Sequence, residues 1–117
     1  MTEPRMDVHV RDDGTTTLIN VFTVDPSDQD ELVRLEIDGI STIASKAPGF
    51  VRGAIHRSLD GTRVVNYLHW EPGAWQRAHE VLGDDPDFVQ HMQDVRKVAT
   101  ADPQTYEVIA VIEGEAS

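Results

Sequence analysis

Two side chains that could bind a ligand stand out in a segment with the composition of a β-strand. Asn66 lies between Val64 and Leu68 at two-residue spacing, and Trp70 follows at the same spacing. Alternate residues of a strand point to one face of a sheet, so the amide and the indole are expected on the same side. Asn is uncommon in strands, and a buried amide must find hydrogen-bond partners. The pair predicts either a pocket that binds a ligand oxygen, or an amide bonded to backbone beside a core tryptophan.

Two further polar side chains belong to the same hypothesis. Asn20 interrupts an earlier apolar segment, and the same two interpretations apply to it. His69 precedes Trp70, and its imidazole titrates near neutral pH, which suits a candidate proton acceptor. Because neighbouring residues of a strand face opposite sides, His69 is expected to point away from Asn66.

The remaining ionisable side chains form no recognisable catalytic or metal-binding motif, so no metal is expected. His79 and His91 are predicted to be surface or hydrogen-bonded helix residues, and His9 is given no role. The acidic pairs are expected at turns and helix starts, where they act as caps. Phosphate-binding glycine loops and the G-x-S-x-G nucleophile motif are absent. The chain has no cysteine, which excludes disulfides, thiolate catalysis and cysteine-ligated metals.

Composition and charge narrow the classes of partner. A chain of 117 residues suits one domain. The net charge is −11, with 10 basic against 21 acidic residues, so nucleic acid and anionic membranes are poor candidates as partners. The sequence shows neither an apolar run long enough for a membrane helix nor a secretory signal. We therefore expect a cytoplasmic location by default.

The elements that must position these side chains follow a regular order. Asp25 and Pro26 are typical of a helix start, and Asp60-Gly61 of a hairpin turn. A mobile tail over 1–14 is expected ahead of a single domain over 15–117. Strands are predicted at Thr15–Val24, Phe50–Leu59, Arg63–Glu71 and Tyr106–Glu113, and helices at Asp25–Lys46, Ala74–Leu82 and Asp87–Val98.

This order, β-α-β-β-α-β, predicts an α+β, ferredoxin-like fold with a four-stranded antiparallel sheet. Two helices on one face of such a sheet leave its other face bare. The bare face carries apolar residues, and the simplest cover for it is a second copy of the same chain. The pattern therefore predicts a homodimer.

A longer string gives a resemblance to a known family. Residues 60–71 contain the pattern D-G-T-x-V-V-N-Y-x-x-W-E, and with it the sequence resembles the antibiotic biosynthesis monooxygenase family. Within that family it is most similar to small cofactor-independent anthrone oxygenases of aromatic polyketide pathways. The similarity runs from about Thr16 to Gly114 and includes Leu32-Val33, Pro48-Gly49-Phe50 and Asp85-Pro86. The resemblance implies a dimeric α/β barrel.

The resemblance also implies site residues and a reaction. Asn66 and Trp70 occupy the positions of the family's catalytic amide and indole, whereas Trp75 replaces a tyrosine and Met92 an arginine. An anthrone or phenol would be oxidised to a quinone by O2, without metal or flavin, and the two catalytic side chains would stabilise the developing oxyanion. The expected apolar pocket and its substrate-binding residues are Leu18, Asn20, Phe22, Leu68, Trp70, Trp75, Phe88 and Met92.

Three other functions remain open at this point. A polyketide cyclase or isomerase would use the same pocket without consuming O2. A haem-degrading relative would have an Asn at the position of Asn20 and a haem-ligating His in the last helix. The position of that His is occupied here by Met92, one residue after His91, and one residue turns a helical side chain by about 100°. A non-catalytic ligand-binding pathway protein would bind the product and show no turnover.

Overall fold

The computed structural model describes residues 15–115, so the predicted tail over 1–14 lies outside the described residues. Within this range no helix is long and apolar enough to cross a membrane. The elements, in chain order, are β1 (Thr16–Val24), the 3₁₀ turn η2 (Pro26–Asp28), α1 (Gln29–Thr42), the 3₁₀ turn η3 (Ala44–Lys46), β2 (Phe50–Arg57), β3 (Arg63–Trp70), α2 (Ala74–Leu82), α3 (Pro86–Arg96) and β4 (Ala99–Tyr106).

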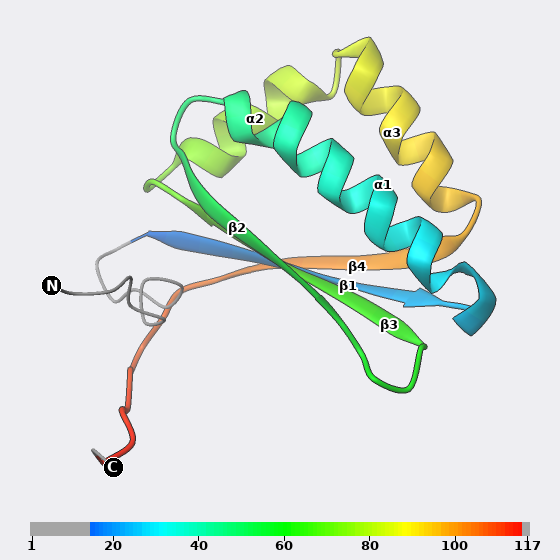
Figure 1. Ribbon diagram of the computed structural model, residues 1–117. Coiled ribbons are helices and arrows are strands. Elements are labelled where there is room, and N and C mark those ends of the chain that lie inside the picture. The colour runs from blue at the N-terminus through cyan, green and yellow to red at the C-terminus, as the bar shows by residue number, and fades with distance from the viewer. Residues whose placement is uncertain (1–14, 116–117) are drawn as a thin grey trace, which may run out of the picture.

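The four strands form one antiparallel sheet in the order β2-β3-β1-β4. The three α-helices lie on one side of this sheet, and no helix covers the other side in the described part of the chain (Figure 1). The predicted ferredoxin-like α+β fold is confirmed. Its layers create the space in which side chains of the sheet can meet side chains of the helices.

Two helical segments, η2 and α3, begin where the sequence places a capping carboxylate before a proline. The Asp25 carboxylate accepts a hydrogen bond from the Ser27 backbone N–H at 3.0 Å, and Pro26 opens the turn. This bond and a second one from the Ser27 hydroxyl hold the pKa of Asp25 below its ordinary value. The Asp85 carboxylate in turn accepts from two backbone N–H groups at the start of α3. The predicted helix starts are correct to within one turn.

The β2–β3 hairpin forms at the predicted Asp60-Gly61 site, although β2 ends at Arg57 rather than at Leu59. Gly61 has a φ of +85°, a conformation that costs glycine little. The Asp60 carboxylate accepts hydrogen bonds from the hydroxyl and backbone N–H of Thr62. These bonds, with one from Ser58, lower the pKa of Asp60 to about 2.

The predicted last strand, Tyr106–Glu113, is wrong. The strand that pairs with β1 is β4, Ala99–Tyr106, which follows α3 almost at once. Its register runs from Val24↔Ala99 to Thr17↔Tyr106, so β4 reaches the beginning of β1 just as the predicted strand would have started. Pro103 is tolerated within β4 because the strand is at the sheet edge. Residues 107–115 leave the sheet without a strand partner in the described chain (Figure 1).

Candidate active site

The two amides singled out by the sequence face each other across neighbouring strands. Asn20 of β1 is the direct partner of Asn66 of β3, and Leu18↔Leu68 and Phe22↔Val64 flank this pair. Direct partners in an antiparallel sheet have Cβ atoms roughly 5 Å apart. Asn66 is 2% exposed. The register thus places both amides side by side under the helices, in the middle of the sheet.

Trp70 lies at the end of β3 in a group of aromatic rings. It is fully buried, with its ring centroid 5.2 Å from that of Phe50 and 5.6 Å from that of Trp75. His79 extends the group from α2, 5.2 Å from Trp75. Gly73, with a φ of +76°, turns the chain from β3 into α2 and so brings Trp75 back over the sheet. These aromatic rings build one wall of a cavity.

This cavity, which we call the sheet cavity, lies between the sheet and the helices and has a volume of about 150 Å³. All eight residues that the sequence predicts as its lining contribute to it. Further lining residues come from all three helices and from β4. The residues are Leu18, Asn20, Phe22, Glu36, Gly39, Ile40, Ile43, Ala44, Asn66, Leu68, Trp70, Trp75, His79, Leu82, Phe88, His91, Met92 and Pro103.

Three polar side chains in contact with one another cross the wall of the sheet cavity. The Asn66 side-chain nitrogen donates a short hydrogen bond to Glu36 Oε1. Glu36 Oε2 lies 3.1 Å from His91 Nε2, and the two side chains are 6% and 14% exposed. These contacts connect β3, α1 and α3 through their side chains. His91 lies on a helix, as predicted, but it is partly buried against Glu36, a contact that the sequence did not predict.

Glycine at position 39 makes room for this histidine. A Cβ atom at Gly39 would lie 2.4 Å from Cε1 of His91 and 2.8 Å from each of its ring nitrogens. Such distances are far below van der Waals contact, so no larger residue fits while the ring stays in place. The close approach of α1 and α3 at this point therefore depends on Gly39.

Glu36 is the site residue that sequence reasoning missed, and a signal for it exists. Leu32, Glu36 and Ile40 are spaced four residues apart on α1, so the carboxylate lies on the helix face that packs on the sheet. Glu is rarely buried unless it has partners. A charged residue at such a position indicates a paired group in the core or in a cavity.

Three buried polar atoms of the sheet cavity have no hydrogen-bond partner among the described residues. They are Asn20 Oδ1, Asn66 Oδ1 and Trp70 Nε1. The orientation of the Asn66 amide follows from chemistry, because a carboxylate only accepts hydrogen bonds and the amide nitrogen must face Glu36. Leaving such a group unsatisfied costs about 1–3 kcal/mol. The cavity therefore offers two acceptors and one donor to a polar ligand.

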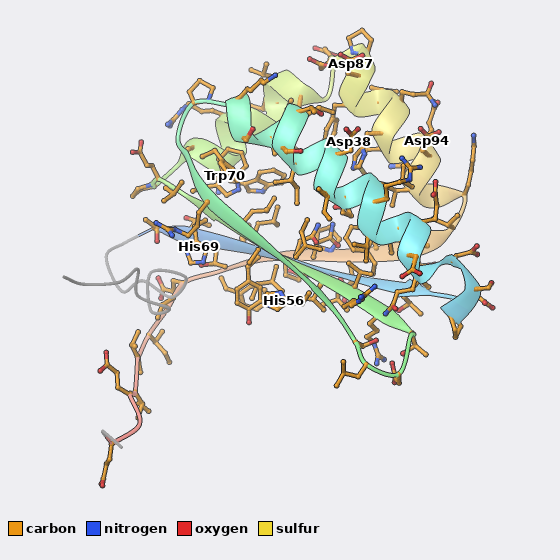
Figure 2. All side chains as sticks on the ribbon, in the orientation of Figure 1. Asp38, His56, His69, Trp70, Asp87 and Asp94 are labelled. Atoms are coloured by element: carbon orange, nitrogen blue, oxygen red, sulfur yellow. The ribbon has the colours of Figure 1, made fainter. Side chains whose placement is uncertain are left out.

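His69, the candidate proton acceptor, lies on the other face of the sheet. It pairs with Thr17 of β1 and Arg52 of β2 and is three residues from Asn66, an odd separation that turns the two side chains to opposite faces. Figure 2 shows Trp70 on the helix-covered side and His69 on the opposite side. His69 is 2% exposed and lines a separate depression with Tyr67 and Tyr106. It does not line the sheet cavity.

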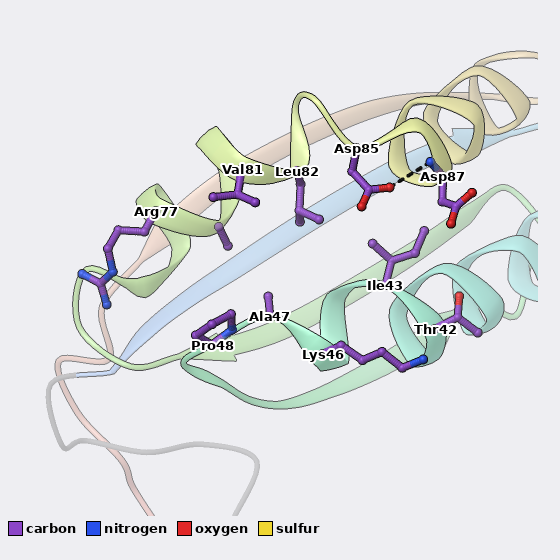
Figure 3. Close-up of a pocket in the computed structure, with 11 residues that line it drawn as sticks. Thr42, Ile43, Lys46, Ala47, Pro48, Arg77, Val81, Leu82, Asp85 and Asp87 are labelled. Carbon is purple, nitrogen blue, oxygen red and sulfur yellow. Dashed lines mark hydrogen bonds between the residues drawn. The ribbon is translucent and has the colours of Figure 1, made fainter.

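A second, more open hollow adjoins the sheet cavity. This outer groove, of about 500 Å³, runs between the end of α1 and α2 (Figure 3). Ile43 and Leu82 line both spaces and so form the partition between them. Lys46 and Arg77 lie along the groove, whereas the unpartnered buried atoms lie in the sheet cavity. We therefore assign the chemistry to the sheet cavity, although the groove is larger.

The fold and the cavity define a class of protein. A ferredoxin-like domain with a largely apolar cavity and a few convergent polar atoms is suited to bind a small, largely apolar molecule. The paired carboxylate and imidazole in its wall add groups that can move a proton. A small-molecule enzyme of the α+β class fits these features.

Comparison with known proteins identifies the family. No family model matches the sequence. Tetracenomycin-F1 monooxygenase of Streptomyces glaucescens is 37% identical over 92 residues, which cover 79% of this chain and 80% of that protein. The chain belongs to the antibiotic biosynthesis monooxygenase family, and it is an oxidoreductase of the monooxygenase type.

Solved structures agree with this fold. A monooxygenase from the gene ActVA-Orf6 of Streptomyces coelicolor, solved in complex with nanaomycin D, is 27% identical with a TM-score of 0.70, covering 86% of this chain and 93% of that one. SnoaB of Streptomyces nogalater, described as a cofactor-independent oxygenase, is 23% identical with a TM-score of 0.64, covering 87% of this chain and all of that one.

Proposed function

We propose that this protein is a cofactor-independent monooxygenase that oxidises an aromatic polyketide anthrone or phenol to a quinone with O2 during antibiotic biosynthesis. One observation carries the proposal: an apolar cavity encloses buried hydrogen-bonding atoms that lack partners, on the two side chains expected to be catalytic. The proposal places the reaction in the cytoplasm, with O2 as co-substrate and no resident metal or flavin.

The proposed reaction converts an anthrone and O2 into an anthraquinone and one water. Loss of a proton from the ring CH2 gives an electron-rich enolate, which passes one electron to O2. The substrate radical and superoxide combine into a peroxide, which takes up a proton. Loss of the second ring proton, with cleavage of the O–O bond, yields the quinone carbonyl and water. The substrate supplies both electron pairs, and the protein supplies orientation and a dry site.

In this scheme the polar atoms of the sheet cavity have different tasks. Trp70 Nε1 donates to the oxygen on which the enolate charge develops, where a well-placed donor is worth about 3–4 kcal/mol. Asn66 Oδ1 and Asn20 Oδ1 accept from substrate hydroxyl groups. The Asn66 nitrogen, which the sequence analysis assigned to the oxyanion, is engaged by Glu36. The apolar side chains of the lining, Met92 among them, hold the rings.

The size of the sheet cavity bears on how the substrate lies. Its 150 Å³ is less than the roughly 300–1,000 Å³ of usual ligand pockets. A three-ring substrate would therefore place its reacting ring in the sheet cavity and extend past Ile43 and Leu82 into the outer groove.

Oxygen uptake with dithranol, a hydroxylated anthrone, tests the function. Metal-stripped protein under air should consume one O2 for each quinone formed. Asn66→Ala and Trp70→Phe should each reduce turnover by about 10²-fold or more. Tyr67→Phe is the matched control, because Tyr67 follows Asn66 on the same strand but faces the other side of the sheet. If both cavity variants keep full turnover, the site is assigned wrongly.

This assay and a spectrum taken with added haemin separate the alternative functions. A cyclase or isomerase acting in this cavity would convert its substrate without O2 uptake. A non-catalytic pathway protein would bind the quinone and leave oxidation at the background rate. A haem-degrading activity would require a Soret shift on adding haemin. Any of these three results, with no O2 uptake above background in the presence of dithranol, would replace the monooxygenase proposal.

We also propose that the protein works as a homodimer, with residues 107–115 contacting the second copy. This segment carries Ile109, Val111 and Ile112, which are 85%, 42% and 92% exposed. Apolar side chains at such exposure favour burial against another surface. The helix-free face of the sheet presents the partly exposed Ile19 and Val21, which offer one.

Light scattering tests the dimer. The full chain should have twice the mass of one chain at micromolar concentration, and Ile109→Asp with Ile112→Asp should shift it toward the monomer. Val81→Asp is the control, because Val81 is also exposed, at 71%, but lies on α2 away from this segment. A monomeric full chain would contradict the proposal.

A further inference from the structure

We infer that Glu36 is the group that takes the proton from the substrate and returns it to the peroxide, held in place by His91 and Asn66. This inference rests on the proposed monooxygenase function and deepens it. His69 was only a candidate proton acceptor, and its side chain is on the far face of the sheet. Glu36 lines the sheet cavity itself.

The placement of the carboxylate carries the inference. Glu36 is 5% exposed, yet its partners are a neutral amide and an imidazole rather than an arginine or lysine. A buried charge used only for stability is usually a poor choice compared with apolar residues. The chain also places Gly39 in the interior of α1, where alanine would favour the helix by about 1 kcal/mol, and this glycine makes room for His91.

The geometry leaves the carboxylate able to accept a proton. Oε1 receives one hydrogen bond from Asn66, and Oε2 lies against His91 Nε2. Each carboxylate oxygen has two lone-pair positions, so each keeps one for the substrate. Because Asn66 is held by its nitrogen, its oxygen and the Glu36 carboxylate belong to one rigid unit in the cavity wall.

Glu36 would act twice in one turnover. The ionised carboxylate takes a proton from the ring CH2, leaving the carbon's electron pair in the enolate. After electron transfer and radical recombination, the neutral carboxyl returns this proton to the peroxide anion. The carboxylate then takes the second ring proton as the O–O bond breaks, and gives it to the departing hydroxide to form water. No net proton enters or leaves, and His91 serves as a positioning residue.

Deuterium exchange without oxygen isolates the proton step. Dithranol is mixed with the protein in D2O under argon, and the incorporation of deuterium at the ring CH2 is followed by NMR against the rate without protein. Glu36→Gln keeps the size of the side chain and its capacity to bind both neighbours, but removes the base. Asp38→Asn is the control, since it removes a carboxylate from an exposed position of the same helix.

We expect Glu36→Gln to reduce the exchange rate and the O2 uptake by at least about 10²-fold. Quinone binding should change less than threefold; it is read from tryptophan fluorescence, since both tryptophans of the chain line the cavity. His91→Leu should lower kcat by about tenfold with little change in KM, and His91→Gln, which can still donate a hydrogen bond, should restore part of it.

Exchange by Glu36→Gln at more than half of the rate of the unmodified protein overturns the inference. If Glu36→Gln does not fold, His91→Leu and His91→Gln decide. Equal kcat values for these two variants overturn the inference. A protein that catalyses no O2 uptake but exchanges deuterium through Glu36 would disprove the monooxygenase function and leave the proton role intact, so the two proposals fail separately.

Discussion

Gly39→Ala tests the arrangement of the site without replacing any of the polar side chains proposed to act in it. The added methyl group would lie 2.4 Å from His91 Cε1. Because carbon atoms approach to roughly 3.5 Å, the imidazole must move by about 1 Å. His91 Nε2 is 3.1 Å from Glu36 Oε2, so such a shift breaks this polar contact.

The energetic cost is the difference between two opposing effects. Alanine in a helix interior is favoured over glycine by about 1 kcal/mol. A lost hydrogen bond to a charged group costs about 1.5–3 kcal/mol. We therefore expect a net destabilisation of about 0.5–2 kcal/mol, seen as a fall in Tm of roughly 2–8 °C for a chain of this length. The effect on kcat should be larger, since a misplacement of about 1 Å can cost up to about 10²-fold.

Thermal unfolding, O2 uptake and anaerobic deuterium exchange measure these effects on one preparation. Gly83→Ala is the matched control, because a Cβ there would meet only backbone oxygens at 3.5 and 3.7 Å and the φ of −59° suits alanine. The control should keep its turnover. If Gly39→Ala keeps the Tm, the exchange rate and the kcat of the unmodified protein, the close packing of His91 on α1 has no part in the proton step.

Three further predictions concern the scaffold around the cavity. Asp85→Ala should lower the free energy of unfolding in urea by about 1 kcal/mol, because the carboxylate caps two N–H groups of α3, whereas Asp84→Ala should change it little. Asp60→Ala should lower Tm at pH 7, because the folded protein holds the pKa of Asp60 at about 2, below the ordinary 3.8. The difference in Tm between the variant and the unmodified protein should shrink as the pH falls from 3.8 toward 2, and a constant difference would contradict the stabilising role of this carboxylate. Ile43→Val should widen the passage between groove and cavity and raise kcat/KM for anthrones bulkier than dithranol, relative to dithranol itself.

Local sequence determined most of the elements and the face on which the proposed catalytic pair lies. Asp25-Pro26 and Asp85-Pro86 mark helix starts because capping acts over two or three residues. Asn66 and Trp70 share a face because a strand alternates with a period of two, which holds in any fold. The same alternation correctly put His69 on the other side. The order of the elements was enough to predict the ferredoxin-like topology.

Only the tertiary structure decided which groups meet across elements. Glu36 and His91 are 55 positions apart, and their contact depends on how closely α1 and α3 pack at Gly39. The position of β4 depends on its register with β1, not on its own weak strand pattern, and the better pattern of Tyr106–Glu113 was therefore misleading. Propensity and alternation are local properties, whereas pairing and the proximity of helices are set by the packing of the whole chain.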